Sequence, residues 1–195
     1  MVKGKNFSCN NVGGKRKASD FYETPYCLTR ELLNVVELKE PILEPARGGG
    51  AITKVLREYG YKDITEYDLE QGTDFFNETR HFKTIITNPP YSKSFAFIAK
   101  AKEVCDEFYF LLPLSYLHGK QRYDNLYKPG FAYPLERIFC FTRYPMLGET
   151  LNADGTINTG MMVYCYFHFN KFYNGDAPTI HWLDIDKYIL RKTKQ

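Results

Sequence analysis

Short apolar runs alternate with helical patterns between residues 24 and 113, and this alternation constrains the fold more than any other feature of the sequence. Apolar side chains at helical spacing predict a helix within 24–39, with Thr24 as its N-cap and Pro25 at its first helical position. The later runs predict a strand and a helix within 41–61, strands within 63–70 and 82–88, a helix over 93–104 and a strand over 107–113. Strands joined through helices form a parallel sheet that is covered on both faces.

The C-terminal part of the sequence follows a different pattern. Two β-rich runs, 135–142 and 161–169, are joined by a segment at 152–160 that contains Asp154, Gly155 and Asn158. Such residues favour a hairpin turn between antiparallel strands. The sequence therefore predicts an α/β fold, a mostly parallel sheet that ends in an antiparallel hairpin.

Composition limits the class of protein. A chain of 195 residues, 44% of them hydrophobic, is long enough for one core, so we expect a single folded domain over 20–195 after a flexible basic arm over 1–19. No run approaches the about 18 to 20 apolar residues of a membrane span, and no signal peptide is evident, so we expect a cytoplasmic protein with no membrane partner. The five cysteines have no metal-like spacing, which favours reduced packing residues and no metal site.

A glycine-rich loop follows the first predicted strand. Ligands of such sheets bind outside the carboxyl ends of the strands, and Gly48, Gly49 and Gly50 let the backbone approach a ligand directly before a helix. Asp68 ends the second predicted strand, where a carboxylate accepts hydrogen bonds from ribose hydroxyls. This pattern indicates a nucleoside-containing cofactor, although Thr53 stands where an NAD-binding loop would have a third glycine.

Five segments, in this order, resemble the motifs of S-adenosylmethionine-dependent amino methyltransferases. They are DFYETP (20–25), ILEPARGGGA (42–51), YDLE (67–70), GTDFF (72–76) and NPPY (88–91). The order is similar to that of N6-adenine DNA methyltransferases, which implies a Rossmann-like seven-stranded methyltransferase sheet and S-adenosyl-L-methionine as the cofactor. Arg47 departs from the pattern, because the family usually has a small residue or cysteine there, and we expect its side chain to bear on cofactor affinity.

The resemblance also implies the residues of a cofactor site. Those near the methionine carboxylate would be Tyr22, Thr24 and Pro25, and those of the loop that holds the methionine amino group and the ribose face would be Glu44, Ala46, Gly48 and Gly50. Asp68 would bind the ribose hydroxyls, Asp74 would accept from the adenine amino group, and Leu69 and Phe75 would sandwich the adenine ring. Taken singly, Asp68 and Asp74 also fit solvated acids, and Phe75 also fits a core residue.

The NPPY segment follows a buried strand and suits methyl transfer to an amino group on an aromatic ring. Such an amine is a poor nucleophile, because its lone pair is delocalised into the ring. The Asn88 side-chain oxygen and the Pro89 carbonyl can accept hydrogen bonds from it and direct its lone pair, while Pro90 keeps the segment rigid. Tyr91 offers a face on which a flipped base can stack. We therefore predict Asn88, Pro89, Pro90 and Tyr91 as the catalytic residues.

Other chemistries remain open at this point. Methylation at cytosine C5 is excluded, because it needs a cysteine after a proline and this chain has none. Enzymes that act on cytosine N4 usually carry serine in place of Asn88. NPPY also occurs in enzymes that methylate a glutamine amide in release factors. Adenine in RNA is a further possible substrate, and a nucleic-acid-binding module without activity is an alternative of another class.

DNA is the partner that the sequence favours. Basic and aromatic residues alternate over 116–137. Phosphate contacts are expected from Lys120, Arg122, Lys128 and Arg137 and, beyond this segment, from Arg143. A solvated loop with its aromatic rings in the core is the alternative interpretation. Only about 25 residues follow the last predicted strand, so we expect specificity to come from the loops 114–135 and 142–160 or from another subunit, a homodimer partner or a specificity partner.

Overall fold

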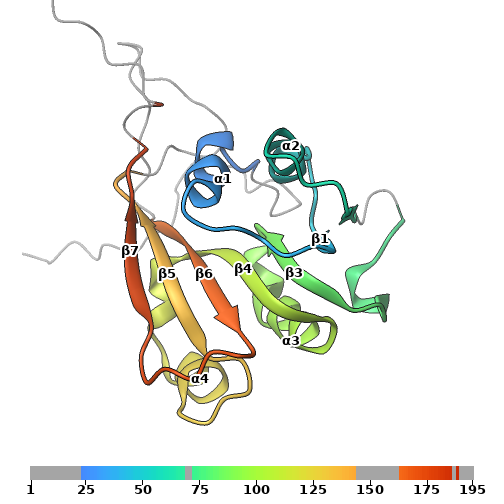
Figure 1. Ribbon diagram of the computed structural model, residues 1–195. Helices are drawn as coiled ribbons and strands as arrows, with labels where there is room; N and C mark the ends of the chain where they lie inside the picture. Colours follow the sequence, from blue (N-terminus) through green and yellow to red (C-terminus); the bar gives the residue numbers. More distant parts are fainter. Residues whose placement is uncertain (1–22, 69–71, 144–162, 186–187, 189–195) are drawn as a thin grey trace, which may run out of the picture.

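The computed structural model describes residues 23–68, 72–143, 163–185 and 188 (Figure 1). Its strands are β1 (Ile42–Glu44), β2 (Ile64–Glu66), β3 (Phe82–Thr87), β4 (Cys105–Pro113), β5 (Leu135–Phe141), β6 (Tyr164–Asn170) and β7 (Thr179–Leu183). Its α-helices are α1 (Tyr26–Leu33), α2 (Ala51–Glu58), α3 (Ser94–Val104) and α4 (Lys120–Arg122). Shorter helical turns are η2 (Phe75–Asn77), η3 (Tyr91–Lys93), η4 (Leu114–Leu117) and η5 (Tyr123–Tyr127).

The strands form one seven-stranded sheet in the order β2-β1-β3-β4-β6-β5-β7. The pairs β2–β1, β1–β3, β3–β4 and β5–β7 are parallel. β6 lies between β4 and β5 and is antiparallel to both. The predicted α/β sheet with a C-terminal antiparallel pair is therefore confirmed, while the turn predicted at 152–160 lies outside the described residues.

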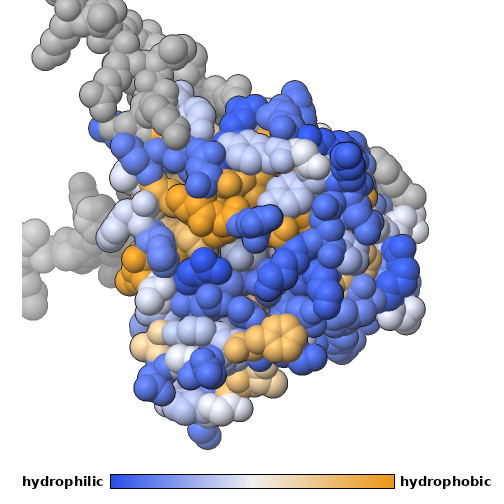
Figure 2. Space-filling model, in the orientation of Figure 1, coloured by the Kyte–Doolittle hydropathy of each residue, from blue (hydrophilic) through white to orange (hydrophobic). Residues whose placement is uncertain are grey.

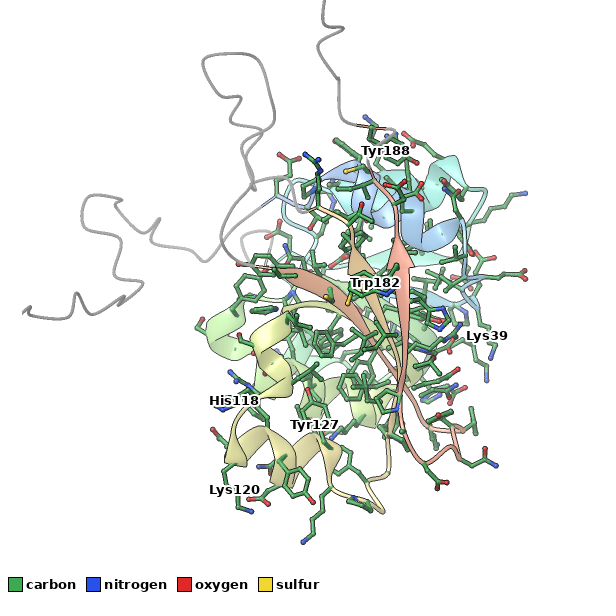
Figure 3. All side chains as sticks on the ribbon, turned by 90° about the vertical axis from the view of Figure 1, so that its left-hand side faces the viewer. Lys39, His118, Lys120, Tyr127, Trp182 and Tyr188 are labelled. Carbon is green, nitrogen blue, oxygen red and sulfur yellow. The ribbon has the colours of Figure 1, made fainter. Side chains whose placement is uncertain are left out.

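The edge strand β7 is a feature that the sequence did not predict. It runs parallel to β5, with Arg137 opposite Thr179 and Phe141 opposite Leu183. Four of its five residues are exposed, Trp182 to 72%, and only Leu183 is buried. Figure 3 shows Trp182 on this outer strand, facing the viewer. The alternation of polar and apolar residues over Thr179–Trp182 was a usable strand signal, but the predicted strands ended at residue 169.

Two hydrophobic layers cover the sheet, one on each face. Side chains of β4 alternate between them: Phe108 packs in the layer with α3, and Tyr109 packs in the layer with α1 and α2. Figure 1 shows α1 and α2 on one face and α3 on the other. In the same orientation, Figure 2 shows hydrophilic residues over α2 and an apolar area below α1, where no helix covers the sheet.

Helix α1 begins one residue later than the sequence predicts. Pro25 is the N-cap, the first helical residue is Tyr26, and no side chain caps this end in the described part of the chain. The predicted N-cap role of Thr24 is therefore wrong. Its hydroxyl is instead hydrogen-bonded to Asn88, far away in sequence.

The described cysteines are free thiols, as the sequence predicts: Cys27, Cys105, Cys140 and Cys165. Burial raises the pKa of the Cys105 thiol, so it stays protonated and packs as a small apolar group. Over the described residues, no helix is long and apolar enough to cross a membrane. Nor does this part of the chain gather three or more His, Cys, Asp or Glu side chains that could hold a metal ion.

Candidate active site

The two loops with the predicted site residues leave neighbouring strands at the same edge of the sheet. β1 pairs with β2 on one side and with β3 on the other, with Leu43 opposite Thr65 and Ile85. From β1 the chain first adds β2 on one side and then adds β3 on the other side, so the order of the strands reverses at β1 (Figure 1). In parallel sheets the carboxyl ends of strands at such a switch point form the ligand-binding crevice. Glu44 at the end of β1 and Asn88 after β3 both lie there.

Glu44 is a buried carboxylate in this crevice, only 1% exposed. Its Oε1 accepts hydrogen bonds from the Thr87 hydroxyl at 2.6 Å and from the Ala46 amide at 3.0 Å. Its Oε2 is also buried and has no hydrogen-bond partner among the described residues. The pKa of Glu44 is raised to about 8, mainly by burial and in smaller part by the nearby Glu66 carboxylate. A cationic ligand would supply the missing partner and stabilise the charged form.

The glycine loop after β1 requires glycine-like backbone at Gly50 and leaves little space at Gly49. Gly50 is the N-cap of α2 and has a φ of 79°, in the left-handed region. A Cβ atom there would also lie 3.2 Å from Nη2 of Arg47. At Gly49, a Cβ atom would lie 3.0 Å from Oε1 of Glu23, whose side chain therefore reaches over the loop. The sequence analysis did not single out Glu23, because an isolated surface acid carries no pattern.

Arg47, the residue that departs from the family pattern, folds across its own loop. Its Nε lies 3.2 Å from Oε1 of Glu66 at the end of β2. The Glu66 carboxylate thus balances the charge of Arg47, and the guanidinium holds the loop against β2. An effect of Arg47 on cofactor affinity stays a prediction.

Asp68 lies beside the glycine loop, as the sequence predicts for a residue that follows the second strand. The Tyr67 amide donates to the Glu44 carbonyl at 2.9 Å, and the Arg47 amide donates to the Tyr67 carbonyl at 2.8 Å. These bonds extend the β1–β2 pairing by a few residues and bring Asp68 to the same edge as Gly48. Tyr22 and Leu69, two further predicted cofactor residues, lie outside the described residues.

Asp74 and Phe75 form the start of η2. One carboxylate oxygen of Asp74 accepts from the Phe76 amide at 3.0 Å and caps this turn. Phe75 is 2% exposed and packs against Phe97, with ring centroids 5.2 Å apart. The structure thus places Phe75 in the core, in line with its alternative interpretation, while Phe76 beside it is exposed. Roles for Asp74 and Phe75 beside an adenine ring stay predictions.

The Asn88 amide is held at both ends. Its Nδ2 donates to the Thr24 hydroxyl at 3.1 Å, and its Oδ1 accepts from the Tyr91 hydroxyl at 3.0 Å. Pro89 is buried, and Pro90 is the N-cap of η3, with its carbonyl accepting from the Lys93 amide at 2.8 Å. The structure therefore brings the predicted catalytic segment together with Thr24 of the predicted cofactor site.

Aromatic side chains line the segment after Asn88. The ring of Tyr91 stacks on Tyr164 at the start of β6, with centroids 5.3 Å apart and planes 24° from parallel. The Ser94 hydroxyl donates to the Tyr91 carbonyl at 2.9 Å and is hydrogen-bonded to the Tyr116 hydroxyl at 2.7 Å. The sequence analysis did not identify Tyr164 as a site residue. No local pattern indicates that the start of β6 lies beside the loop that follows β3.

The basic segment after β4 lies next to this site, since η4 directly follows β4 and Tyr116 contacts Ser94. The Arg122 guanidinium lies 4.4 Å above the Tyr116 ring and donates to the His118 carbonyl at 2.8 Å. The side chain of Lys120 is 80% exposed and lies 2.6 Å from Asp124. Figure 3 shows His118, Lys120 and Tyr127 on the flank formed by this segment.

Arg137 and Tyr133 are two residues of the basic and aromatic segment over 116–137. Arg137 is near the amino end of β5, at the sheet edge opposite the site, and its Nε donates to Nδ1 of His168 at 3.3 Å. Arg137 thus lies in the strand that the sequence predicts over 135–142, and a phosphate contact from its side chain stays a prediction. Tyr133 is buried and donates to the Cys105 carbonyl at 2.7 Å, which makes it a core residue.

Comparison with known proteins supports the fold. No protein-family model matches the chain, and no curated protein matches it. Among solved structures, it is similar to a provisionally assigned RNA methyltransferase from Pyrococcus horikoshii, with a TM-score of 0.51 and 14% identity over 78% of this chain and 88% of that one. It is also similar to a provisionally assigned class I S-adenosylmethionine-dependent methyltransferase from Listeria monocytogenes, with a TM-score of 0.52 and 15% identity over 81% of this chain and 63% of that one. At such low identity these likenesses show the fold, the Rossmann-like sheet of class I methyltransferases.

Proposed function

We propose that this protein transfers a methyl group from S-adenosyl-L-methionine to the N6 amino group of adenine in DNA. The observation that carries the proposal is the Glu44 carboxylate, which is buried at the switch point with one oxygen unpartnered among the described residues. The methionine part of this cofactor has an ammonium group, the kind of donor that such an oxygen lacks. Its sulfonium supplies an electrophilic methyl group when it is bound.

The remaining cofactor contacts follow from the placement of the loops. Asp68, beside the glycine loop, is suited to accept hydrogen bonds from ribose hydroxyls. The Glu23 carboxyl group lies close to Gly49, and the Glu44 carboxyl group accepts from the Ala46 amide of the same loop, so two carboxyl groups lie next to it. This arrangement favours a ligand with positive charge near the loop.

Asn88 and Pro89 are proposed to act on the target amine. The Oδ1 atom of Asn88 has two lone pairs, so it can accept from the Tyr91 hydroxyl and from the target amino group at once. A second acceptor, the Pro89 carbonyl, would draw the lone pair of the nitrogen out of conjugation and direct it to the methyl group. Holding both reactants in this geometry contributes on the order of 7 to 11 kcal/mol in well-oriented systems. The amine's proton then leaves to water.

The basic segment after β4 supports nucleic acid as the substrate. Lys120 and Lys128 are exposed, and the segment begins beside the Asn88 loop through the contact of Tyr116 with Ser94. Phosphate contacts give affinity without reading sequence, so we expect short or loose recognition by this segment and strong dependence on salt. A base in a duplex cannot reach Asn88, so the target adenine must be flipped out or single-stranded.

The test is a transfer assay with cofactor that is labelled in its methyl group. Duplex DNA, single-stranded DNA, RNA and a release factor are offered separately, and the products are digested and identified. We expect N6-methyladenine in DNA, its loss in Asn88→Ala, and normal yield in the control Asn34→Ala, which alters a surface asparagine at the end of α1. Label only in RNA or only in a glutamine side chain would refute DNA as the substrate. No transfer and no binding of the cofactor would refute the reaction itself.

A further inference from the structure

We infer that Thr24 is a positioning residue, whose hydroxyl sets the orientation of the catalytic Asn88 amide when the cofactor binds. The inference rests on the proposed function, in which Asn88 must present its oxygen to the target amine. The contact that carries it joins the two predicted halves of the site: Nδ2 of Asn88 lies 3.1 Å from Oγ1 of Thr24.

An asparagine amide has one end that accepts hydrogen bonds and one end that donates them. Only the orientation with Oδ1 toward the target supports the proposed chemistry, because an NH₂ group there would repel the hydrogens of the amine. The two ends are nearly equal in size, so packing alone discriminates poorly between the orientations. Their hydrogen-bond partners must therefore decide.

The partners of the Asn88 amide that are described above, Thr24 and Tyr91, both contribute hydroxyl groups. Tyr91 donates to Oδ1, and a phenol is a better donor than acceptor because its lone pair is delocalised into the ring. A Thr24 hydroxyl both donates and accepts, so by itself it is compatible with either orientation. What fixes its direction is the group to which its own hydrogen points.

The cofactor supplies such a group. Thr24 is predicted to contact the methionine carboxylate, which only accepts hydrogen bonds. A hydroxyl that donates to a carboxylate keeps its lone pairs for Asn88 and must accept from Nδ2. Thr24 is 5% exposed, and it makes no cap bond to α1 in the described chain, so its hydroxyl is available for this relay. Binding of the cofactor then holds the Asn88 amide in the orientation that the structure shows, with Nδ2 on Thr24 and Oδ1 left to accept from the target.

The experiment compares Thr24→Val, which removes the hydroxyl at nearly constant shape, with Thr24→Ser, which keeps it. Each is made with Asn88 and also with Asn88→Asp, whose two carboxylate oxygens both accept, so that a flip has no consequence. We expect Thr24→Val to lower kcat about tenfold with Asn88 and less than about threefold with Asn88→Asp. Thr24→Ser should restore most of the rate. Any loss of cofactor affinity caused by Thr24→Val should, by contrast, be the same with Asn88 and with Asn88→Asp.

A second measurement does not require turnover. The side-chain amide NMR signals of Asn88, identified by their loss in Asn88→Asp, are followed as S-adenosylhomocysteine is added. This product of methyl transfer keeps the amino-acid carboxylate of the cofactor but has no transferable methyl group. We expect the signals to shift and to exchange more slowly with water in the wild type and in Thr24→Ser, and to respond much less in Thr24→Val.

The outcomes separate the two proposals. Equal loss of kcat in both backgrounds, or the same amide response in Thr24→Val as in the wild type, would overturn the relay while methyl transfer itself stands. If the wild type transfers no methyl group to any substrate, the proposed function fails, and the amide signals alone decide the relay. A wild type that does not bind S-adenosylhomocysteine would overturn both.

Discussion

Replacing Glu44 by glutamine is the most informative single change, because it keeps the shape of a buried side chain and removes its titration. The pKa of Glu44 is raised from its ordinary 4.5 to about 8 by burial. A carboxyl whose pKa is raised on folding binds its proton more tightly in the folded state. Its contribution to stability is therefore fully present below pH 4.5 and is lost as the pH rises toward 8.

The size of the effect follows from the two pKa values. They differ by about 3.5, and each pKa unit corresponds to about 1.4 kcal/mol, so the ceiling for the loss is about 5 kcal/mol. We expect the free energy of unfolding of the wild type to fall by several kcal/mol between pH 5 and pH 9, relative to Glu44→Gln. Urea denaturation at a series of pH values measures it. Glu103→Gln, at an exposed pair with Lys100 on α3, is the control and should follow the wild type.

Cofactor binding provides the second half of this test. Below pH 8 the free protein carries a protonated Glu44, and an ammonium ligand favours the charged form, so binding should release a proton. Calorimetry in two buffers of different ionisation enthalpy counts that proton. Glu44→Gln should release none and should bind about 10- to 100-fold more weakly, as expected for a lost hydrogen bond to a charged group. A stability difference that does not vary with pH would contradict the titration of Glu44, and unchanged affinity in the variant would contradict its contact with the ammonium group.

Three further predictions concern the rest of the site. Asn88→Ala should abolish methyl transfer while cofactor affinity, measured by calorimetry, changes little; unfolding of the variant would instead make Asn88 structural. Asp68→Ala should weaken cofactor binding about tenfold, the cost of lost hydrogen bonds to ribose, and an unchanged Kd would contradict its assignment. Lys120→Ala with Lys128→Ala should weaken DNA binding for all sequences and reduce the slope of log K against log salt by about 2, as fluorescence anisotropy can show, whereas an unchanged slope would place the DNA elsewhere.

Local patterns were sufficient to predict most of the sheet and the position of its binding edge. β1, β3 and β4 were recognised because buried parallel strands are continuous apolar runs. Glycines or prolines that follow these runs also marked where the strands end. The NPPY segment and the glycine loop were recognised in the same way, since each is a run of adjacent residues whose backbone demands are local. β7 was not, because its residues are mostly exposed and do not form a continuous apolar run.

Only the tertiary structure decided which distant side chains meet. The sequence contains Glu44, Thr24, Asn88 and Tyr164, but their spacing does not reveal that Glu44 is buried with an unpartnered oxygen among the described residues, or that Thr24 accepts from Asn88. The same limit applies to Phe75, whose place in the core depends on α3 packing over it. The physical reason is that turns and strand ends depend on interactions over a few residues. Burial and hydrogen-bond partners instead depend on how separate elements pack, and the number of residues between two side chains does not determine whether they meet.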